Sequence, residues 1–486
     1  METSSDTVRR NRPHILMVTT SLKGHFPPFV QLLYRLADFW RLQSPHDTCI
    51  VTVVGVKEDL LDLKRLQFDG AFRGVDLRLL EMCVEIFQSG NPKRPIDPLI
   101  QTKMFQDAFE PLQQKMIEEK KNGGLEIPTC LIPDFLLTFT KDLAESLEIP
   151  WIPFFHCPAW CTQSFLMFEE ILDLPVTTSS NDFIPIPGLQ CFRQNDIASE
   201  IWVTPEWFQN LRRNTCNKWL SAVLFNTAPE LEGPGGALNA LQSFFSKQVD
   251  IKQVPKLYTI GPMLQLPGFG AQYTTSIPEN DSCLQWLDMQ AEKSVLYISF
   301  GTLGNLNWEE MRELAHGLEA SGVAFLWILK VSSPAEAITL LTPGFLDRTR
   351  HRGFIHIGWA PQTRILSHWA VGGFISHCGW NSIMESISNG VPIISWPVFV
   401  DQPMNARFIS DVAKVGVPVM EDFNHKKTIV SRTCVEKAIR TLMFEKTGTE
   451  LRYNAVKLKE VLTASVAEGG SSHANLRKFL QEILMI

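Results

Sequence analysis

Short runs of apolar and β-branched residues recur along this chain, separated by longer segments with the spacing of amphipathic helices. In the first half these runs lie at residues 14–20, 49–55, 129–132, 151–155 and 222–227. After a break they return at residues 294–300, 324–330, 354–358, 372–376 and 392–396. Short buried strands that alternate with helices form βαβ units with parallel sheets. The pattern therefore predicts an α/β protein with two parallel-sheet domains.

The length of the chain agrees with two domains. At 486 residues, 45% of them apolar, it is larger than a single hydrophobic core usually supports. A stretch rich in Pro, Gly and Ser, without a consistent period, predicts an interdomain linker at residues 262–282. We therefore expect a first domain at residues 1–261, a second at 283–465, and a C-terminal helix at 466–486 whose apolar residues pack against one of the two domains.

The composition argues against several classes of protein. The net charge is −7 with acidic and basic residues intermixed, so no basic stripe is available to bind nucleic acid. No stretch reaches the roughly 18 to 20 consecutive apolar residues that span a bilayer, and the N-terminus lacks the pattern of a secretory signal. The 10 cysteines are scattered as buried thiols usually are. We expect a cytoplasmic protein without a transmembrane segment.

Polar residues follow several of the predicted strands, where open parallel sheets bind their ligands. These residues are His25, Asp134, Thr302, His377, Asp401 and Gln402. If His25 and Asp134 meet, they form an imidazole base supported by a carboxylate, which can deprotonate an alcohol. Spacing alone leaves a plainer alternative open, in which the histidine caps a helix and the aspartate pairs with an unrelated Lys or Arg.

The segment HCGWNSIMESISNG, which begins at His377, reads as the end of a strand, a glycine-containing turn and a helix that opens with Asn381 and Ser382. Free backbone N–H groups and the positive end of the helix dipole favour an anion at such a helix start. A diphosphate fits there without a metal, and the chain has no D-x-D pair of carboxylates to hold one. No G-x-G-x-x-G follows a strand, so a nicotinamide cofactor is not expected.

Residues 359–402 closely resemble the signature box of the plant family of UDP-dependent glycosyltransferases that act on small molecules. The resemblance rests on the Trp-Ala-Pro-Gln opening, the His-Cys-Gly-Trp-Asn-Ser centre and the Asp-Gln ending, all in register. The sequences GHFPP, CLIPD, QWLD and SVLYISFGT match the family elsewhere. The resemblance implies the GT-B fold, in which two facing Rossmann-like domains each hold a parallel sheet flanked by helices. It implies no cofactor, with UDP-glucose as co-substrate, and we expect a monomer.

The resemblance also implies a role for each residue of the box. The nucleoside would be held by Trp359, Ala360, Gln362 and Glu385. The diphosphate would be held by Thr302, His377, Asn381 and Ser382. The sugar hydroxyls would be held by Trp380, Asp401 and Gln402. In the family, Gln at the last of these positions usually accompanies glucose.

The sequence departs from the family pattern at two places near the expected sugar and acceptor. His156 stands where most members have a Ser or Thr that reaches the sugar, and Val400 stands where many have a smaller residue. By resemblance, His25 would deprotonate an acceptor hydroxyl with Asp134 orienting it, so that glucose is transferred with inversion to give a β-O-glucoside. The aromatic-rich segment around His156 favours a flavonoid or other phenolic acceptor.

Two alternatives from other classes remain at this point. A nucleotide-sugar-binding protein without catalysis would keep the phosphate site, as would a UDP-sugar epimerase-like enzyme. The His25 and Asp134 pair argues against the first. The sugar-contacting residues of the signature box argue against the second.

Overall fold

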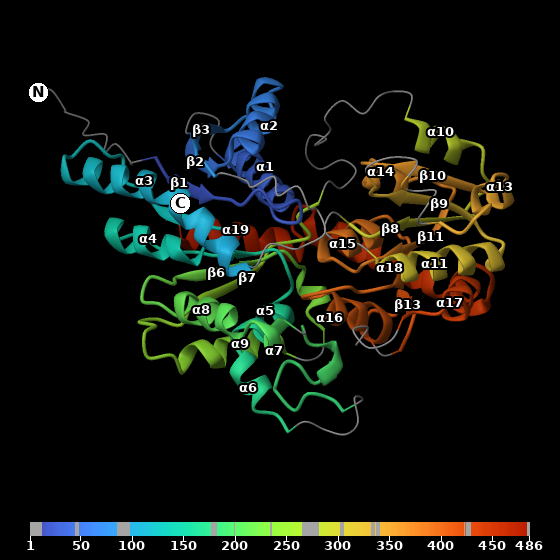
Figure 1. Cartoon of the computed structure of the whole chain (residues 1–486). Coiled ribbons are helices and arrows are strands. Elements are labelled where there is room, and N and C mark those ends of the chain that lie inside the picture. The colour runs from blue at the N-terminus through green and yellow to red at the C-terminus, as the bar shows by residue number, and fades with distance from the viewer. Residues whose placement is uncertain are drawn as a thin grey trace, which may run out of the picture.

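The computed structural model shows two lobes that lie side by side (Figure 1). The first lobe is built on strands β1 to β7 and the second on strands β8 to β13. The described residues are 12–43, 48–84, 98–175, 182–198, 200–233, 236–264, 281–301, 306–331, 336, 341–421, 423 and 429–483. Most of the expected linker, residues 265–280, lies outside this described part of the chain.

The first lobe contains one continuous series of parallel strands. One sheet has the order β3-β2-β1-β4 and the next has the order β5-β6-β7. Parallel bridges from Leu131 to Trp151 and from Asp134 to Phe154 join β4 to β5. The strands are β1 His14–Val18, β2 Cys49–Gly55, β3 Val75–Glu81, β4 Cys130–Pro133, β5 Phe154–Phe155, β6 Ala222–Phe225 and β7 Lys256–Thr259.

Helices cover both faces of this series. They are α1 Phe26–Gln43, α2 Lys57–Phe68, α3 Pro98–Lys121, α4 Lys141–Leu147, α5 Ala159–Leu166, α6 Phe168–Leu172, α7 Glu200–Val203, α8 Pro205–Thr215 and α9 Ala237–Ser246, with short helices η1 Thr138–Thr140, η2 Gln194–Asp196 and η3 Pro229–Leu231. Leu16 of β1 packs in the same core as Phe109 of α3, whereas Ile15 and Met17 pack with Leu33 of α1. Because both faces are covered, β1 is apolar from Ile15 to Val18.

The second lobe repeats this plan with a sheet of order β10-β9-β8-β11-β12-β13, in which all pairings are parallel. Its strands are β8 Val295–Ser299, β9 Ala324–Leu329, β10 Gly353–Ile357, β11 Val371–Ser376, β12 Ile393–Ser395 and β13 Gly416–Pro418. Its helices are α10 Ser282–Asp288, α11 Trp308–Ser321, α13 Phe345–Thr349, α14 Gln362–Leu366, α15 Trp380–Ser388, α16 Gln402–Arg407, η4 Phe408–Val412, α17 Arg432–Phe444 and α18 Lys446–Val466.

Both sheets reverse their strand order at one place, between β1 and β4 in the first lobe and between β8 and β11 in the second. Ligands of open parallel sheets bind beyond the carboxyl ends of the strands at such reversals. The predicted site residues that follow these strands therefore gather at these two places.

The C-terminal helix α19, Ser471–Ile483, returns to the first lobe (Figure 1). Phe479 and Leu480 are fully buried in the core that contains β1 and α1. Its polar contacts include one to β7, where Asn475 donates to the carbonyl of Thr259, and one to η3, where the Ser471 hydroxyl donates to Glu230. The helix expected at 466–486 thus packs against the first lobe, although the whole second lobe separates the two in the sequence.

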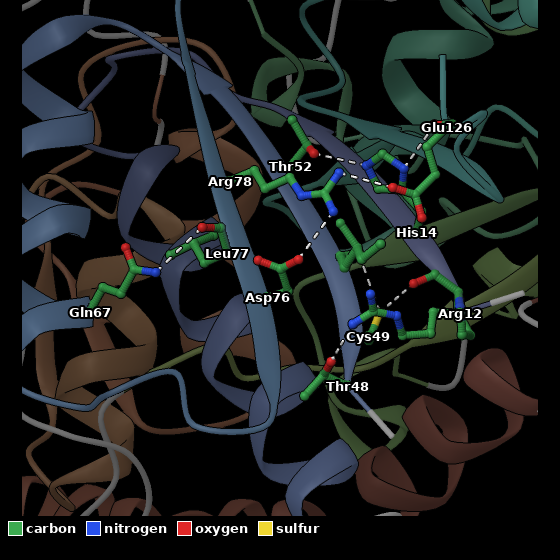
Figure 2. Close-up of polar contacts among 12 residues, drawn as sticks. Arg12, His14, Thr48, Cys49, Thr52, Gln67, Asp76, Leu77, Arg78 and Glu126 are labelled. Carbon is green, nitrogen blue, oxygen red and sulfur yellow. Dashed lines mark hydrogen bonds and ion pairs between the residues drawn. The ribbon is translucent and has the colours of Figure 1, made fainter. Parts of the chain in front are cut away.

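A polar network closes the opposite end of the first sheet, where β1 begins. Figure 2 shows the imidazole of His14 between Thr52 and Glu126. Nδ1 of His14 donates to the carbonyl of Glu126, so Nε2 accepts from the Thr52 hydroxyl at 2.8 Å. Arg78 of β3 binds the carboxylates of Asp76 and Glu126. This end of the sheet is held by hydrogen bonds, whereas the ligand end carries the candidate site.

Among the described residues, no helix is long and apolar enough to cross a membrane.

Candidate active site

A histidine and an aspartate meet where β1 and β4 end. His25 lies in the turn between β1 and α1, and Asp134 follows β4 directly. Nδ1 of His25 lies 2.8 Å from Oδ2 of Asp134. Because β1 and β4 are neighbouring parallel strands, their carboxyl ends bring the two residues to the same edge of the sheet. The structure thus joins the histidine and aspartate that were paired from the sequence.

The carboxylate fixes the position of the proton on His25. An ionised carboxylate only accepts hydrogen bonds, so Nδ1 of His25 carries the hydrogen and Nε2 keeps its lone pair. The His25 side chain is 20% exposed, while that of Asp134 is fully buried. Burial alone would raise the pKa of Asp134, but the interactions with His25 and His156 hold that pKa well below its usual range. The pair is therefore a base with a fixed tautomer.

Other donors complete the surroundings of this carboxylate. The Thr20 hydroxyl donates to Oδ2 at 2.8 Å and the Leu136 amide donates to Oδ1 at 3.0 Å. His156, expected near the sugar, lies with Nε2 3.3 Å from Oδ2 of Asp134. The ligand-type atoms of His25, Asp134 and His156 lie within 4.8 Å of one another. Because each ring already has the carboxylate as its partner, hydrogen bonding accounts for this cluster without a metal ion.

An apolar recess borders the carboxylate network on the first lobe. Thr20 forms part of its wall and the rest comes from α3, the segment after β4 and α8. The lining residues are Thr20, Gln101, Thr102, Phe105, Leu136, Leu137 and Trp207. The recess has a volume of only about 20 Å³, far below that of a ligand pocket, so it shows that the wall beside Thr20 is apolar and does not itself outline an acceptor site.

In the second lobe, β11 leads through His377 into the start of α15. A Cβ atom on Gly301, where φ is +67°, would lie 2.3 Å from Cε1 of His377. Glycine is therefore needed for the imidazole to pack against this turn. Burial, together with the charge of Lys330, lowers the pKa of His377 to about 4. His377 is thus a neutral hydrogen-bonding group beside the N–H groups at the start of α15.

Polar side chains connect α14 to α15 where the nucleoside is expected. Nε2 of Gln362 donates to Oε2 of Glu385 at 2.6 Å and to the Ser382 hydroxyl at 3.0 Å. Burial raises the pKa of Glu385 to about 7, against the opposing effect of the Gln362 hydrogen bond. Trp359 is 69% exposed, an unusual state for an indole, and Ala360 beside it is buried. The exposed ring face is available to a planar base.

The segment before α16 holds the residues expected at the sugar. Oε1 of Gln402 accepts from the amides of Val398 and Phe399 at 2.9 and 3.1 Å. Its amide nitrogen is therefore the group left for a ligand. Asn405 donates to Oδ2 of Asp401 at 2.7 Å, and burial raises the pKa of Asp401 to about 6. Val400 has φ of +54°.

Two of the residues that were expected to bind the UDP-sugar make hydrogen bonds to the first lobe. Nε1 of Trp380 donates to the carbonyl of Asn226 at 2.6 Å, so a sugar contact by Trp380 would have to come from its ring or backbone. Nδ2 of Asn381 donates to the carbonyl of Gly24 at 2.6 Å. Because Gly24 precedes His25, the start of α15 lies against the loop that carries the base. Thr302 lies outside the described residues.

Known proteins are similar to this chain in sequence and in the arrangement of the sheets. Residues 243–461 match the family described as UDP-glucoronosyl and UDP-glucosyl transferase. A zeatin O-xylosyltransferase from Phaseolus vulgaris is 37% identical, over 96% of this chain and 97% of the relative. UDP-glycosyltransferase 76E11 from Arabidopsis thaliana is 36% identical, over 74% of this chain and 76% of the relative. The chain belongs to the plant UDP-glycosyltransferase family.

Solved structures confirm the GT-B fold that the resemblance implied. The structure of UDP-glucose: anthocyanidin 3-O-glucosyltransferase in complex with UDP superposes with a TM-score of 0.79 at 26% identity, covering 98% of this chain and 99% of the other. This plant glycosyltransferase is thus a UDP-dependent enzyme that acts on small molecules.

Sequence reasoning missed several residues of the glycosyltransferase site. Thr20 and Asn226 each follow a strand, so the strand-end rule that selected His25 could have selected them. Tyr297 lies inside β8 and donates to Oε1 of Gln362 at 3.2 Å, and no pattern distinguishes it from a core tyrosine. Glu200 accepts from the Val400 amide at 3.2 Å across the lobes, a contact that depends on how the two lobes meet.

Proposed function

We propose that this glycosyltransferase transfers glucose from UDP-glucose to a hydroxyl of a small hydrophobic acceptor, a flavonoid or another phenolic, and forms a β-O-glucoside. The observation that carries the proposal is the 2.8 Å contact between Nδ1 of His25 and the buried Asp134 carboxylate, at the carboxyl ends of β1 and β4. The first domain, residues 1–261, would bind the acceptor. The second, residues 283–465, would bind the UDP-sugar, with the linker at 262–282 between them.

In the proposed reaction Nε2 of His25 takes the proton of the acceptor hydroxyl. The hydroxyl oxygen forms a bond to the anomeric carbon from the face opposite UDP, while the bond from that carbon to the diphosphate oxygen breaks and UDP leaves. Configuration at the anomeric carbon inverts. Asp134 stabilises the imidazolium, and such base assistance is typically worth about 10²- to 10⁴-fold in rate.

The second lobe would stabilise the leaving group. Negative charge grows on the diphosphate, and the N–H groups at the start of α15, with neutral His377 and the side chains of Asn381 and Ser382, provide hydrogen bonds to it. This assignment of the diphosphate needs no metal ion. Alignment of the two substrates across the lobes would supply further rate acceleration.

Glucose is proposed as the donor because Gln402 ends the signature box and its amide nitrogen remains for a sugar hydroxyl. The matching anthocyanidin enzyme uses UDP-glucose, and a flavonol 3-O-glucosyltransferase from Arabidopsis thaliana is 35% identical over 73% of this chain. A second candidate is xylose transfer to zeatin, which the name of the Phaseolus vulgaris relative supports because the match spans 96% of this chain.

We also propose that the enzyme acts as a monomer in the cytoplasm. All ten cysteines are free thiols in the structure, and the cytoplasm keeps such thiols reduced.

Mass spectrometry of the products tests this function. Purified protein would be incubated with UDP-glucose or UDP-xylose and a panel of flavonoids, simple phenols and zeatin. We expect a hexose added to a phenolic acceptor, with the activity reduced at least about 100-fold in His25→Ala because the base is lost. The control is His351→Ala, an exposed histidine away from the site. A pentose on zeatin would select the second candidate, and UDP-sugar binding without transfer would indicate a binding protein.

A further inference from the structure

A second imidazole shares the carboxylate that supports His25. Nε2 of His156 lies 3.3 Å from Oδ2 of Asp134, the same oxygen that Nδ1 of His25 contacts at 2.8 Å. The centroids of the two imidazole rings are 4.6 Å apart. We propose that His156 is a positioning residue which, by donating to Asp134, limits how strongly that carboxylate holds a proton on His25. The inference rests on the proposed role of His25 as the base.

Packing holds the ring of His156 in this orientation. It follows β5 directly and is 5% exposed. Its ring lies edge-on to Phe154 with centroids 4.6 Å apart, and tilted against Phe29 at 5.3 Å. Aromatic rings on these sides leave the imidazole little freedom to turn away from Asp134.

His156 is a neutral donor and not a second cation. The carboxylate can only accept, so Nε2 of His156 carries the hydrogen. Burial lowers the pKa of His156 to about 4, although the Asp134 charge acts in the opposite direction. Nδ1 is then unprotonated, and among the described residues it has no hydrogen-bond partner. At neutral pH His156 therefore supplies one N–H to Asp134 and no charge.

Three donors compete for one carboxylate oxygen. Oδ2 of Asp134 accepts from the Thr20 hydroxyl, from His25 and from His156, whereas a carboxylate oxygen has two lone pairs. Each hydrogen bond to a carboxylate stabilises its negative charge. Each additional donor therefore weakens the interaction of the carboxylate with any one of its other partners. Without the His156 donor, Asp134 would stabilise the His25 imidazolium more strongly. The base would then stay protonated, and inactive, up to a higher pH than in the parent protein.

Other charges act on this cluster. From the second lobe, Asp401 interacts electrostatically with His25. Lys23, two residues before His25, interacts with Asp59 on α2. Neither Asp401 nor Lys23 is altered by a substitution at His156, so a change in the titration of His25 would report on the shared carboxylate.

Nuclear magnetic resonance of the full chain with labelled histidines tests the proposal without a substrate. The signals of His25 would be assigned by their loss in His25→Ala. His156→Met has similar volume and no donor, whereas His156→Gln places an amide N–H near the position of Nε2. We expect His156→Met to raise the midpoint of the His25 titration by about 0.5 to 1 pH unit, and His156→Gln to leave it within about 0.2 unit.

An unchanged or lowered midpoint in a folded His156→Met protein would overturn the proposal, as would equal shifts in both variants. If His156→Met does not fold, His156→Asn replaces it, because its amide is too short to reach Asp134. The acidic limb of kcat/KM against pH should move with the titration midpoint. If no acceptor is glycosylated, the proposed function fails, yet the titration result still decides the coupling of the two histidines.

Discussion

Val400 shows at the scale of one residue how the site departs from ordinary backbone geometry. Its φ of +54° is a genuine outlier for a β-branched side chain, and it directly precedes the proposed sugar contacts Asp401 and Gln402. The Val400 amide donates to Oε2 of Glu200 in the first lobe. Strain of this kind persists where surrounding contacts fix the backbone, which is frequent at binding sites.

Substituting Val400 with Gly should therefore cost little stability. Left-handed geometry costs a residue with a side chain about 1–2 kcal/mol, and the substitution removes this cost. The gain offsets two losses, namely the greater flexibility of glycine, about 0.5–1 kcal/mol, and the packing of a half-buried side chain. We expect the free energy of unfolding to change by less than about 1 kcal/mol, measured by chemical denaturation. The matched control is Val398→Gly, without positive φ, which should lose more. Equal losses in the two variants would show that the strain is negligible.

Glu385 predicts a pH dependence of donor binding. The pKa of its carboxyl is raised to about 7, and the proposed contact to the ribose hydroxyls requires the ionised form. Affinity for UDP-glucose should therefore fall as pH decreases through this value, by about 5- to 10-fold between pH 8 and pH 6, measured by calorimetry. Both phosphates of UDP-glucose stay ionised in this window. Glu385→Gln should remove the step near pH 7 and leave only the smaller change near pH 6 from Asp401, whose pKa is raised to about 6. A step near pH 7 that persists in this variant would contradict the role.

At the scale of elements, the strands that could be predicted are those with continuous apolar runs, most of them buried, together with the half-buried β10. The buried runs that become β1, β2, β8, β9 and β11 were predicted because parallel strands covered on both faces are continuously apolar. The edge strand β3 was missed because its sequence VDLRLLE mixes half-buried, exposed and charged positions. The rule that ligands bind at strand ends predicted His25 and Asp134, because their neighbouring strands bring the two side chains close together. The contact of Trp380 with Asn226 was not predictable, because it depends on how the separate lobes meet.

The docking of α19 is an element-scale feature that its helical period could not assign to a lobe. Phe479 is fully buried and lies edge-on to Tyr258 with ring centroids 5.5 Å apart. Phe479→Ala should destabilise the protein by about 3–5 kcal/mol and make the C-terminus sensitive to limited proteolysis. Arg477→Ala on the exposed face of the same helix should stay within about 0.5 kcal/mol of the parent. A resistant C-terminus in Phe479→Ala would mean that other contacts hold the helix.

At the scale of the whole molecule, a buried ion pair joins the two lobes. Arg407 at the end of α16 binds both oxygens of Asp196 in η2 through Nε, at 3.1 and 3.0 Å. Asp196 is fully buried and the Arg407 side chain is 5% exposed. Since α16 begins at Gln402, this pair sets the position of the proposed sugar contacts relative to the first lobe.

Breaking the pair should therefore affect stability and catalysis together. Arg407→Met leaves the Asp196 carboxylate buried without its partner, which should cost about 3–5 kcal/mol in chemical denaturation. Asp196→Leu combined with Arg407→Met removes both charges, so it should be less destabilised than the sum of the single variants. Arg407→Lys keeps the charge but loses the bidentate geometry. If the pair aligns the lobes, kcat/KM for UDP-glucose should remain low in the double variant even where stability recovers. Recovery of both would show that the ion pair contributes to folding alone.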